Sequence, residues 1–233
     1  MTKMGRTMAF GGIRTVLSGA IIAALFGMAA CGTETSEEGN AQPLSGAQLS
    51  QAALSQGDIA GYTIRDVSAG SKAGSAEVSD ESCRPIADVL TPESLAYDGR
   101  LVQRDIWKTP TGSEVADASY RLMLLSAESG EAAEKAVQDL EKAVSSCGSG
   151  FEVTLSGEAH NVRQVLLNKS EFGDESVDFS FEYQMGMKRR YVVVSSGASL
   201  SIFSASNQRN NAFIAVPGEL VDEQKSKLEG EKS

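Results

Sequence analysis

Residue types able to carry out catalysis are few in this 233-residue chain, and their spacing selects no reaction. A nucleophile needs a base within hydrogen-bond reach, and the only imidazole in the sequence is His160. We expect this histidine in a loop or at a strand edge, in a structural or solvent-facing role. The sequence has no G-x-S-x-G elbow, and no lysine of the mature domain has a serine three positions earlier. These two absences exclude the simplest serine-nucleophile arrangements.

Carboxylates are abundant, and four of them fall within eight residues: Glu171, Asp174, Glu175 and Asp178. A glycosidase needs two carboxyl groups flanking one bond, and this spacing selects no pair. The run also lacks the alternating acids and terminal glutamate of a calcium loop. We therefore predict a solvated turn that precedes a strand. A cell-envelope hydrolase that uses scattered Asp and Glu residues remains an alternative.

One dense basic cluster, Lys188-Arg189-Arg190, interrupts the acidic chain. Side chains of an extended segment alternate between its two faces, so these three charges do not form one patch. We predict a solvated hairpin end, with contact to an anionic ligand or partner as the alternative. The nearby aromatic residues Phe179, Phe181 and Tyr183 are expected in the core rather than in a ligand cage.

The first thirty residues have the features of an export signal. Lys3, Arg6 and Arg14 precede an uncharged run of fifteen residues, Val16–Ala30, which is shorter than a membrane-spanning helix needs. The run ends in small residues before Cys31, and this junction resembles the lipobox of bacterial lipoproteins. The resemblance implies cleavage after Ala30 and acylation of Cys31, with membrane lipid as its partner. Two acyl chains hold a soluble domain stably at a membrane.

The domain boundaries follow from this leader. We expect a lipoprotein signal peptide over residues 1–30, a flexible polar tether over 31–43 and a folded domain over 44–230. Cleavage leaves Cys83 and Cys147, which in an exported protein most simply form a disulfide. A metal site made of Cys83, Cys147 and His160 lacks a fourth ligand and any C-x-x-C spacing, so neither a metal nor a cofactor is predicted.

The charge balance argues against a nucleic-acid partner. The chain carries 21 basic and 31 acidic residues, a net charge of −10. The first thirty residues contain three basic residues and no acid, so the remainder has 18 against 31, a net charge of −13. A body this acidic repels phosphate backbones and is not expected to bind nucleic acid.

The hydrophobic pattern predicts a mainly antiparallel sheet with a few helices. The clearest helix is Glu131–Cys147, with Ser129 as its cap and an apolar stripe from Ala133 to Val144. The clearest strand covers residues 177–185, where apolar and polar residues alternate. Further helices are expected over 44–55, from Cys83-Arg84-Pro85 to Pro92, and over 217–228. Further strands are expected over 62–67, 101–109, from 113 to about 126, and over 151–155, 162–167, 190–195 and 200–204.

Strands that alternate apolar and polar residues place one sheet face on the core and the other in water. Residues 68–80 have low complexity and are expected to form a loop. The predicted fold class is α+β, a single domain with a mainly antiparallel twisted sheet flanked by helices.

Several short segments resemble actinobacterial lipoproteins that carry the extracytoplasmic sensor domain of PknH-type mycobacterial receptor kinases. The resemblance covers most of residues 44–228 and rests on five segments: Gly61-Tyr62, Cys83–Leu90, Ser146–Phe151, Gly173–Val177 and Val216-Pro217. It implies a twisted antiparallel sheet flanked by helices, with a cleft for an unidentified ligand. Those kinase-linked domains have two disulfides, whereas this chain has cysteines for one. The resemblance supplies no catalytic residue.

The sequence therefore predicts a non-enzymatic binding or sensor-like lipoprotein on the extracytoplasmic face of the cell membrane. Its partner would be a small ligand or an envelope protein, neither of which the sequence identifies. The alternatives are the envelope hydrolase described above and an accessory protein of a membrane complex.

Overall fold

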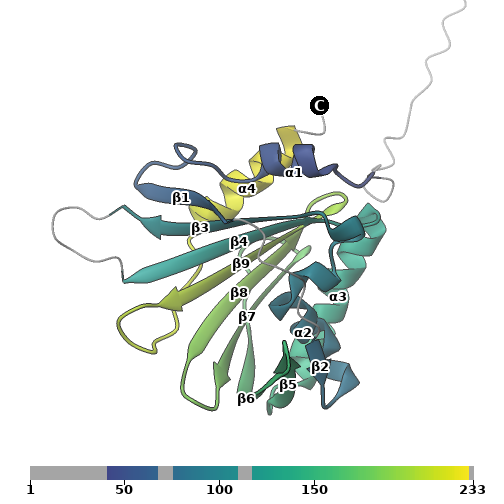
Figure 1. Ribbon diagram of the computed structural model, residues 1–233, viewed down its shortest axis with the longest axis vertical. Helices are drawn as coiled ribbons and strands as arrows, with labels where there is room; N and C mark the ends of the chain where they lie inside the picture. Colours follow the sequence, from purple (N-terminus) through teal and green to yellow (C-terminus); the bar gives the residue numbers. More distant parts are fainter. Residues whose placement is uncertain (1–40, 68–75, 110–116, 231–233) are drawn as a thin grey trace, which may run out of the picture. The chain divides into compact units, whose positions relative to one another are not determined.

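The computed structural model describes residues 41–67, 76–109 and 117–230. These residues all belong to one compact unit, Ser36–Ser233. Within them nine strands form a single sheet in the order β1-β3-β4-β9-β8-β7-β6-β5-β2, and every neighbouring pair is antiparallel. The strands fan out from one another as the sheet twists (Figure 1). The α+β class and the mainly antiparallel sheet predicted from the sequence are confirmed.

The elements have the following bounds. The strands are β1 (Tyr62–Val67), β2 (Ala76–Val78), β3 (Leu101–Lys108), β4 (Ala118–Ser126), β5 (Phe151–Leu155), β6 (Glu158–Asn168), β7 (Ser176–Tyr183), β8 (Lys188–Ser195) and β9 (Ser199–Asn207). The α-helices are α1 (Gly46–Ala52), α2 (Arg84–Leu90), α3 (Gly130–Ser146) and α4 (Gly218–Gly230). Short 3-10 turns cover Glu81–Cys83, Pro92–Ser94 and Tyr97–Gly99.

The sheet carries a hydrophobic core on each face, which corrects the expectation that one face is wet. Helices α2 and α3 pack on one face, and α1 and α4 pack on the other. The reason lies in consecutive apolar residues on the central strands, Leu122–Leu125 and Tyr191–Val194. Alternate members of each run point to opposite faces, so both faces need a cover. Apolar and polar residues alternate strictly along β5 and β7.

Helix α3 forms as its sequence predicts. The Ser129 hydroxyl accepts a hydrogen bond from the Ala132 amide and caps its first turn. Its buried stripe, which includes Val137 and Leu140, covers β6 to β9 near one end of those strands. The loop after α3 requires glycine at position 150, which has a φ of +89°; a Cβ there would meet the Val162 carbonyl oxygen at 2.1 Å.

On the opposite face, one buried side chain joins α4 to the end of α1. Gln224 has no exposed surface; its Oε1 accepts from the Leu54 amide at 3.0 Å, and its Nε2 donates to the Ala52 carbonyl at 2.9 Å. The Tyr62 hydroxyl donates to the Glu219 carboxylate at 2.8 Å and ties α4 to β1. These contacts fix two helices that are far apart in the sequence.

Some boundaries differ from the sequence predictions. Strand β2 lies inside the segment that was expected to be a loop, and it pairs with β5 more than seventy residues later. Helix α1 is shorter than predicted, because the backbone becomes extended at Ala53. The Ala53 and Leu54 side chains are nevertheless buried in the core. Strand β6 begins at Glu158, four residues before the predicted start.

Candidate binding groove

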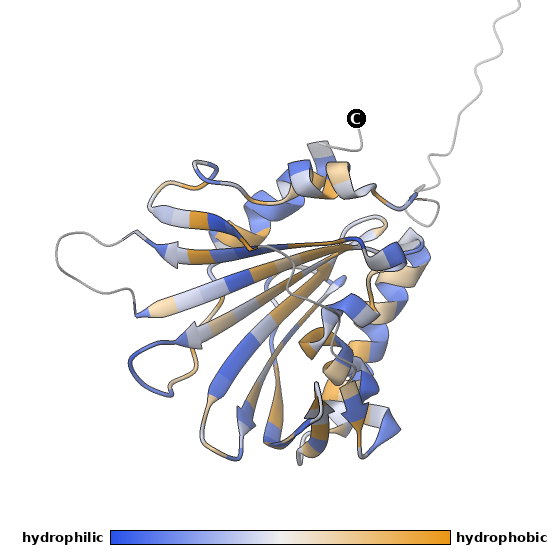
Figure 2. Cartoon of the chain, in the orientation of Figure 1, coloured by the Kyte–Doolittle hydropathy of each residue, from blue (hydrophilic) through white to orange (hydrophobic). Residues whose placement is uncertain are grey.

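Of the elements that the structure describes, α2 and α3 cover their face of the sheet at one end of its central strands (Figure 1). Hydrophobic colours gather near α3, and hydrophilic colours dominate toward the opposite strand ends (Figure 2). Beyond the helices, two adjoining pockets open on this face, and together they form what we call the groove. Their volumes are about 290 and 310 Å³, at the small end of the range for ligand sites.

The two pockets share three residues: Arg121 of β4, Ser204 of β9 and Arg189 of β8. The pocket of about 290 Å³, called the polar pocket, is further lined by Asp105, Ile106, Trp107, Ser119, Tyr120, Ser206 and Gln208. The pocket of about 310 Å³, called the aromatic pocket, is further lined by Val89, Leu90, Met123, Leu155, His160, Tyr183, Met187 and Tyr191.

Strand register places the shared residues side by side. Arg121 lies opposite Ser204 across β4 and β9, and Ser204 lies opposite Tyr191 across β9 and β8. Arg189 precedes Tyr191 by two residues and so points to the same face. The row of Arg121, Ser204 and Tyr191 therefore forms the floor between the two pockets.

The two groove arginines differ in their electrostatic partners. The Arg121 Nε donates to the Asp105 carboxylate at 2.8 Å in a half-exposed ion pair. Arg189 lines the aromatic pocket beside Tyr191, and no carboxylate of the described residues forms an ion pair with Arg189. Burial raises the pKa of Tyr191, and attraction to Arg189 and Arg121 offsets only part of that effect. Tyr191 thus stays a neutral phenol, and no carboxylate of the described residues neutralises the Arg189 charge.

The polar pocket contains a small network of hydroxyl and amide groups. The Ser119 and Ser206 hydroxyls lie 2.9 Å apart. The Gln208 amide nitrogen donates to both of them, at 2.6 and 3.1 Å. Trp107 lies on the same wall, with the Arg65 guanidinium 4.9 Å from its ring centroid. This pocket offers hydrogen-bonding groups beside an aromatic surface.

The aromatic pocket corrects one expectation about a single residue. His160 lies within β6, between β5 and β7, rather than in a loop or at a strand edge, and its ring centroid is 6.0 Å from that of Tyr183. Phe179 and Phe181 are fully buried, as predicted, and Tyr183 packs against the same core while it also lines the pocket. Burial, together with the neighbouring Tyr191, raises the pKa of Tyr183.

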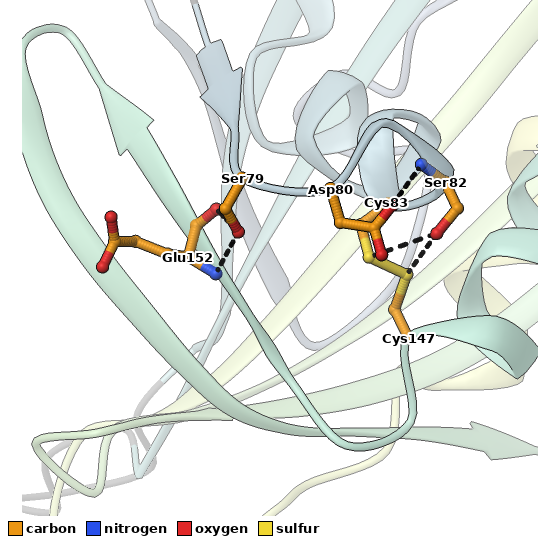
Figure 3. Close-up of a disulfide and its surroundings, with 6 residues drawn as sticks. All are labelled: Ser79, Asp80, Ser82, Cys83, Cys147 and Glu152. Carbon is orange, nitrogen blue, oxygen red and sulfur yellow. Dashed lines mark hydrogen bonds between the residues drawn. A yellow bond between two sulfur atoms is a disulfide. The ribbon is translucent and has the colours of Figure 1, made fainter.

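A disulfide positions one wall of the groove. Cys83 and Cys147 are bonded, with their Cα atoms 5.9 Å apart, and they join the start of α2 to the end of α3 (Figure 3). The Ser82 hydroxyl lies 3.9 Å from both sulfur atoms, and the Asp80 carboxylate accepts from the Ser82 amide. Because Val89 and Leu90 follow on α2, the disulfide holds the helix that closes the aromatic pocket.

The acidic run does not stay together in the structure. Glu171, Asp174 and Glu175 are exposed before β7, as predicted for a turn. Asp178 is only 3% exposed, which corrects the prediction that it is solvated. It accepts two hydrogen bonds from Arg190, at 2.6 and 2.8 Å, because the pairing of β7 with β8 places both side chains on the α1–α4 face of the sheet.

The basic cluster divides between the two faces, as the sequence predicts. Lys188 lies 3.6 Å from the Glu182 carboxylate, and Arg190 pairs with Asp178. Arg189 points the other way, into the groove. The resemblance implied a cleft, but the sequence did not identify its residues, because the floor of the groove comes from strands β4, β8 and β9, whose order in the sheet cannot be read from the sequence.

A third pocket, of about 290 Å³, lies between α2 and α3 and is mainly apolar. No group of three or more potential metal ligands occurs within the described ranges, and no helix in them is long and apolar enough to cross a membrane. Cys31, the residue expected to be acylated, and the whole predicted signal peptide lie outside the described residues.

No protein-family model matches the sequence, and no curated protein matches it either. Among solved structures, the extracellular domain of PknH from Mycobacterium tuberculosis aligns with a TM-score of 0.52 at 10% identity, over 83% of this chain and 99% of that domain. An uncharacterised Mycobacterium smegmatis protein, an Rv0999 ortholog, aligns with a TM-score of 0.35 at 11% identity, over 84% of this chain and all of that one. The chain therefore has the fold of the PknH extracellular domain, the fold that its sequence motifs resemble.

Proposed function

We propose that this chain is a non-catalytic binding module, anchored by lipid at the extracytoplasmic face of the membrane, that captures a ligand in the groove. The observation that carries the proposal is a pair of adjoining pockets on one sheet face, with polar groups converging on their shared floor. Pre-formed concave sites with a few placed polar groups are typical of ligand binding.

The groove rests on a rigid scaffold, which favours binding of a ligand without rearrangement of the protein. Its floor belongs to three hydrogen-bonded central strands, and the helix at its wall is held by the Cys83–Cys147 disulfide. A site that is formed before the ligand arrives loses less conformational entropy on binding.

Two observations support a role without catalysis and outside the cytoplasm. Among the described side chains, no serine or cysteine hydrogen-bonds to His160, which lies beside the Tyr183 ring. A solved structure with the same fold is the extracellular domain of PknH.

Ligand capture can be tested by blocking the groove. Ser204 is 6% exposed on the floor that both pockets share, so Ser204→Phe fills the junction between them. Full-length wild-type protein incubated with envelope extracts, washed and analysed by mass spectrometry should retain a compound that Ser204→Phe loses. Ser145→Phe, on the exposed side of α3, is the matched control and should retain it. Equal retention by all three proteins, or no retained compound, would contradict the proposal.

Lipid anchoring has a separate test. Expressed in an actinobacterial host, the wild-type chain should incorporate a clickable fatty acid and partition into the detergent phase of a cloud-point separation. Cys31→Ala should do neither, whereas the Cys83→Ala/Cys147→Ala double variant should still be labelled. Labelling that survives Cys31→Ala would refute acylation at this position.

A further inference from the structure

The charge in the groove has the opposite sign to that of the protein. The chain has a net charge of −10, yet the charged side chains on the two pocket walls, His160 aside, are Asp105, Arg121 and Arg189. Asp105 already neutralises Arg121 through its ion pair. The groove therefore keeps the positive charge of Arg189.

Arg189 differs from its neighbours in the partners of its charge. Lys188 and Arg190, on either side of it, both pair with carboxylates on the opposite face of the sheet. Arg189 lines the aromatic pocket beside Tyr191, two residues further along β8, and its neighbour there is a phenol rather than a carboxylate. A planar guanidinium at the wall of a pocket is suited to binding a carboxylate or a phosphate with two hydrogen bonds.

The groups next to Arg189 have a different chemistry. Ser119, Ser206 and Gln208 bring two hydroxyls and an amide within 3.1 Å of one another, with Trp107 on the same wall. Hydroxyl and amide groups both donate and accept hydrogen bonds, as the hydroxyls of a sugar do. The aromatic surface beside them can cover the apolar face of a sugar ring.

We propose that the groove binds an acidic saccharide, with its anionic group on Arg189 and its hydroxyls on Ser119, Ser206 and Gln208. This inference rests on the proposed function and specifies the ligand class of the same site. The anion is a carboxylate, as in a uronic acid, or a phosphate, as in a sugar phosphate. The two pocket volumes suit a ligand of one or two rings.

The test uses the full chain, purified in a mild detergent, and calorimetric titration with three probes: glucuronic acid, a glucose phosphate and glucose. At least one acidic probe should bind at least ten-fold more tightly than glucose, and the tighter one identifies the anion. Arg189→Gln should weaken that binding roughly 10- to 100-fold, the range for a hydrogen bond to a charged group. Lys188→Gln removes an equal charge one residue away on the other face and should change the affinity less than two-fold.

A second variant guards against misfolding, since Arg189 is half-buried. Ser206→Ala removes one hydroxyl from the polar pocket and should weaken acidic and neutral probes by similar factors. Equal affinity for glucose and the acidic probes, or unchanged affinity in Arg189→Gln, would overturn the anionic class while leaving capture in the groove intact. No binding of any probe at millimolar concentration would overturn the saccharide class. Loss of the proposed function itself would appear only in the Ser204→Phe capture experiment.

Discussion

At the scale of single residues, two partly buried carboxylates have pKa values shifted in opposite directions. Burial raises the pKa of Asp88 in the α2–α3 pocket, and the hydrogen bond from Ser94 with the attraction of Arg84 offsets only part of it. Burial also acts on Asp58, but the Lys227 ammonium at 2.6 Å and two bonds from Ser55 outweigh it and lower the pKa. The two acids therefore affect stability with opposite dependence on pH.

Asp88→Asn should stabilise the protein at neutral pH. A folded-state pKa above the unfolded value means that ionisation favours the unfolded chain, so Asp88 lowers stability as pH rises through the interval between the two pKa values. Asparagine keeps the oxygen that accepts from Ser94 and carries no charge. Thermal unfolding should give a higher Tm for the variant at pH 7, with the gap closing toward acidic pH.

The control for this prediction is Asp222→Asn, on the exposed side of α4, which should shift the Tm little at any pH. If Asp88→Asn is less stable than wild type at pH 7, the ionised carboxylate gains more from its neighbours in the folded protein than it loses by burial, and the prediction is wrong.

At the scale of elements, the joint between α1 and α4 depends on one amide. Gln224→Met keeps the length of the side chain but leaves the Leu54 N–H and the Ala52 carbonyl without partners in a buried site. Each unsatisfied group costs about 1–3 kcal/mol, so we expect a loss of about 2–4 kcal/mol in urea unfolding. Ser226→Met, two positions further along α4 on its exposed side, should stay within about 0.5 kcal/mol of wild type. A loss below about 1 kcal/mol at position 224 would mean that water replaces the amide.

The disulfide should stabilise the domain chiefly by restricting the unfolded chain. Its cysteines are 64 positions apart, for which loop-closure entropy gives about 4 kcal/mol. Cys83→Ala/Cys147→Ala should therefore lose roughly that amount in urea unfolding, and wild type under strong reductant should lose the same. A double variant as stable as the oxidised wild type would show that residual structure in the unfolded chain already holds these ends together.

Elements were predicted correctly from the sequence where their own residues determine them, and not where they depend on pairing with a distant segment. Helix α3 and strand β7 were predicted well because their hydrophobic periods are long and uninterrupted. Strand β2 was missed because three residues in a low-complexity stretch form a strand only by pairing with β5. Asp178 looked like its exposed neighbours because nothing in the sequence shows that Arg190 lies beside it across a hairpin.

The groove was the least predictable feature for the same reason. Arg121 and Ser204 are 83 positions apart and become neighbours only because β9 inserts between β4 and β8. The sequence indicated only that Arg189 is separated from Lys188 and Arg190 by the alternation of a strand. The order of strands in a sheet depends on how all the apolar surfaces of the chain can be buried at once, so it cannot be read from any single segment.

At the scale of the whole molecule, one sheet serves two cores. Leu122 and Leu124 point to the α1–α4 face, and Met123 and Leu125, from the same strand, point to the α2–α3 face. Strand β8 divides in the same way, with Val192 on one face and Val193 on the other. Neither core can lose its strands without exposing the other, so the two should unfold in one cooperative step.

Native-state hydrogen exchange on the Gln224→Met variant tests this coupling across the sheet. The substitution lies in the α1–α4 core, while the α3 amides of Val137 and Leu140 lie in the opposite one. If both cores unfold together, the free energy of exchange of these α3 amides should decrease by the same amount as the free energy of unfolding of the whole protein. Fluorescence of Trp107, the only tryptophan, and far-UV circular dichroism should also give coincident transitions. If the α3 amides keep their wild-type protection in the variant, the two cores unfold separately, and the prediction of one cooperative step is wrong.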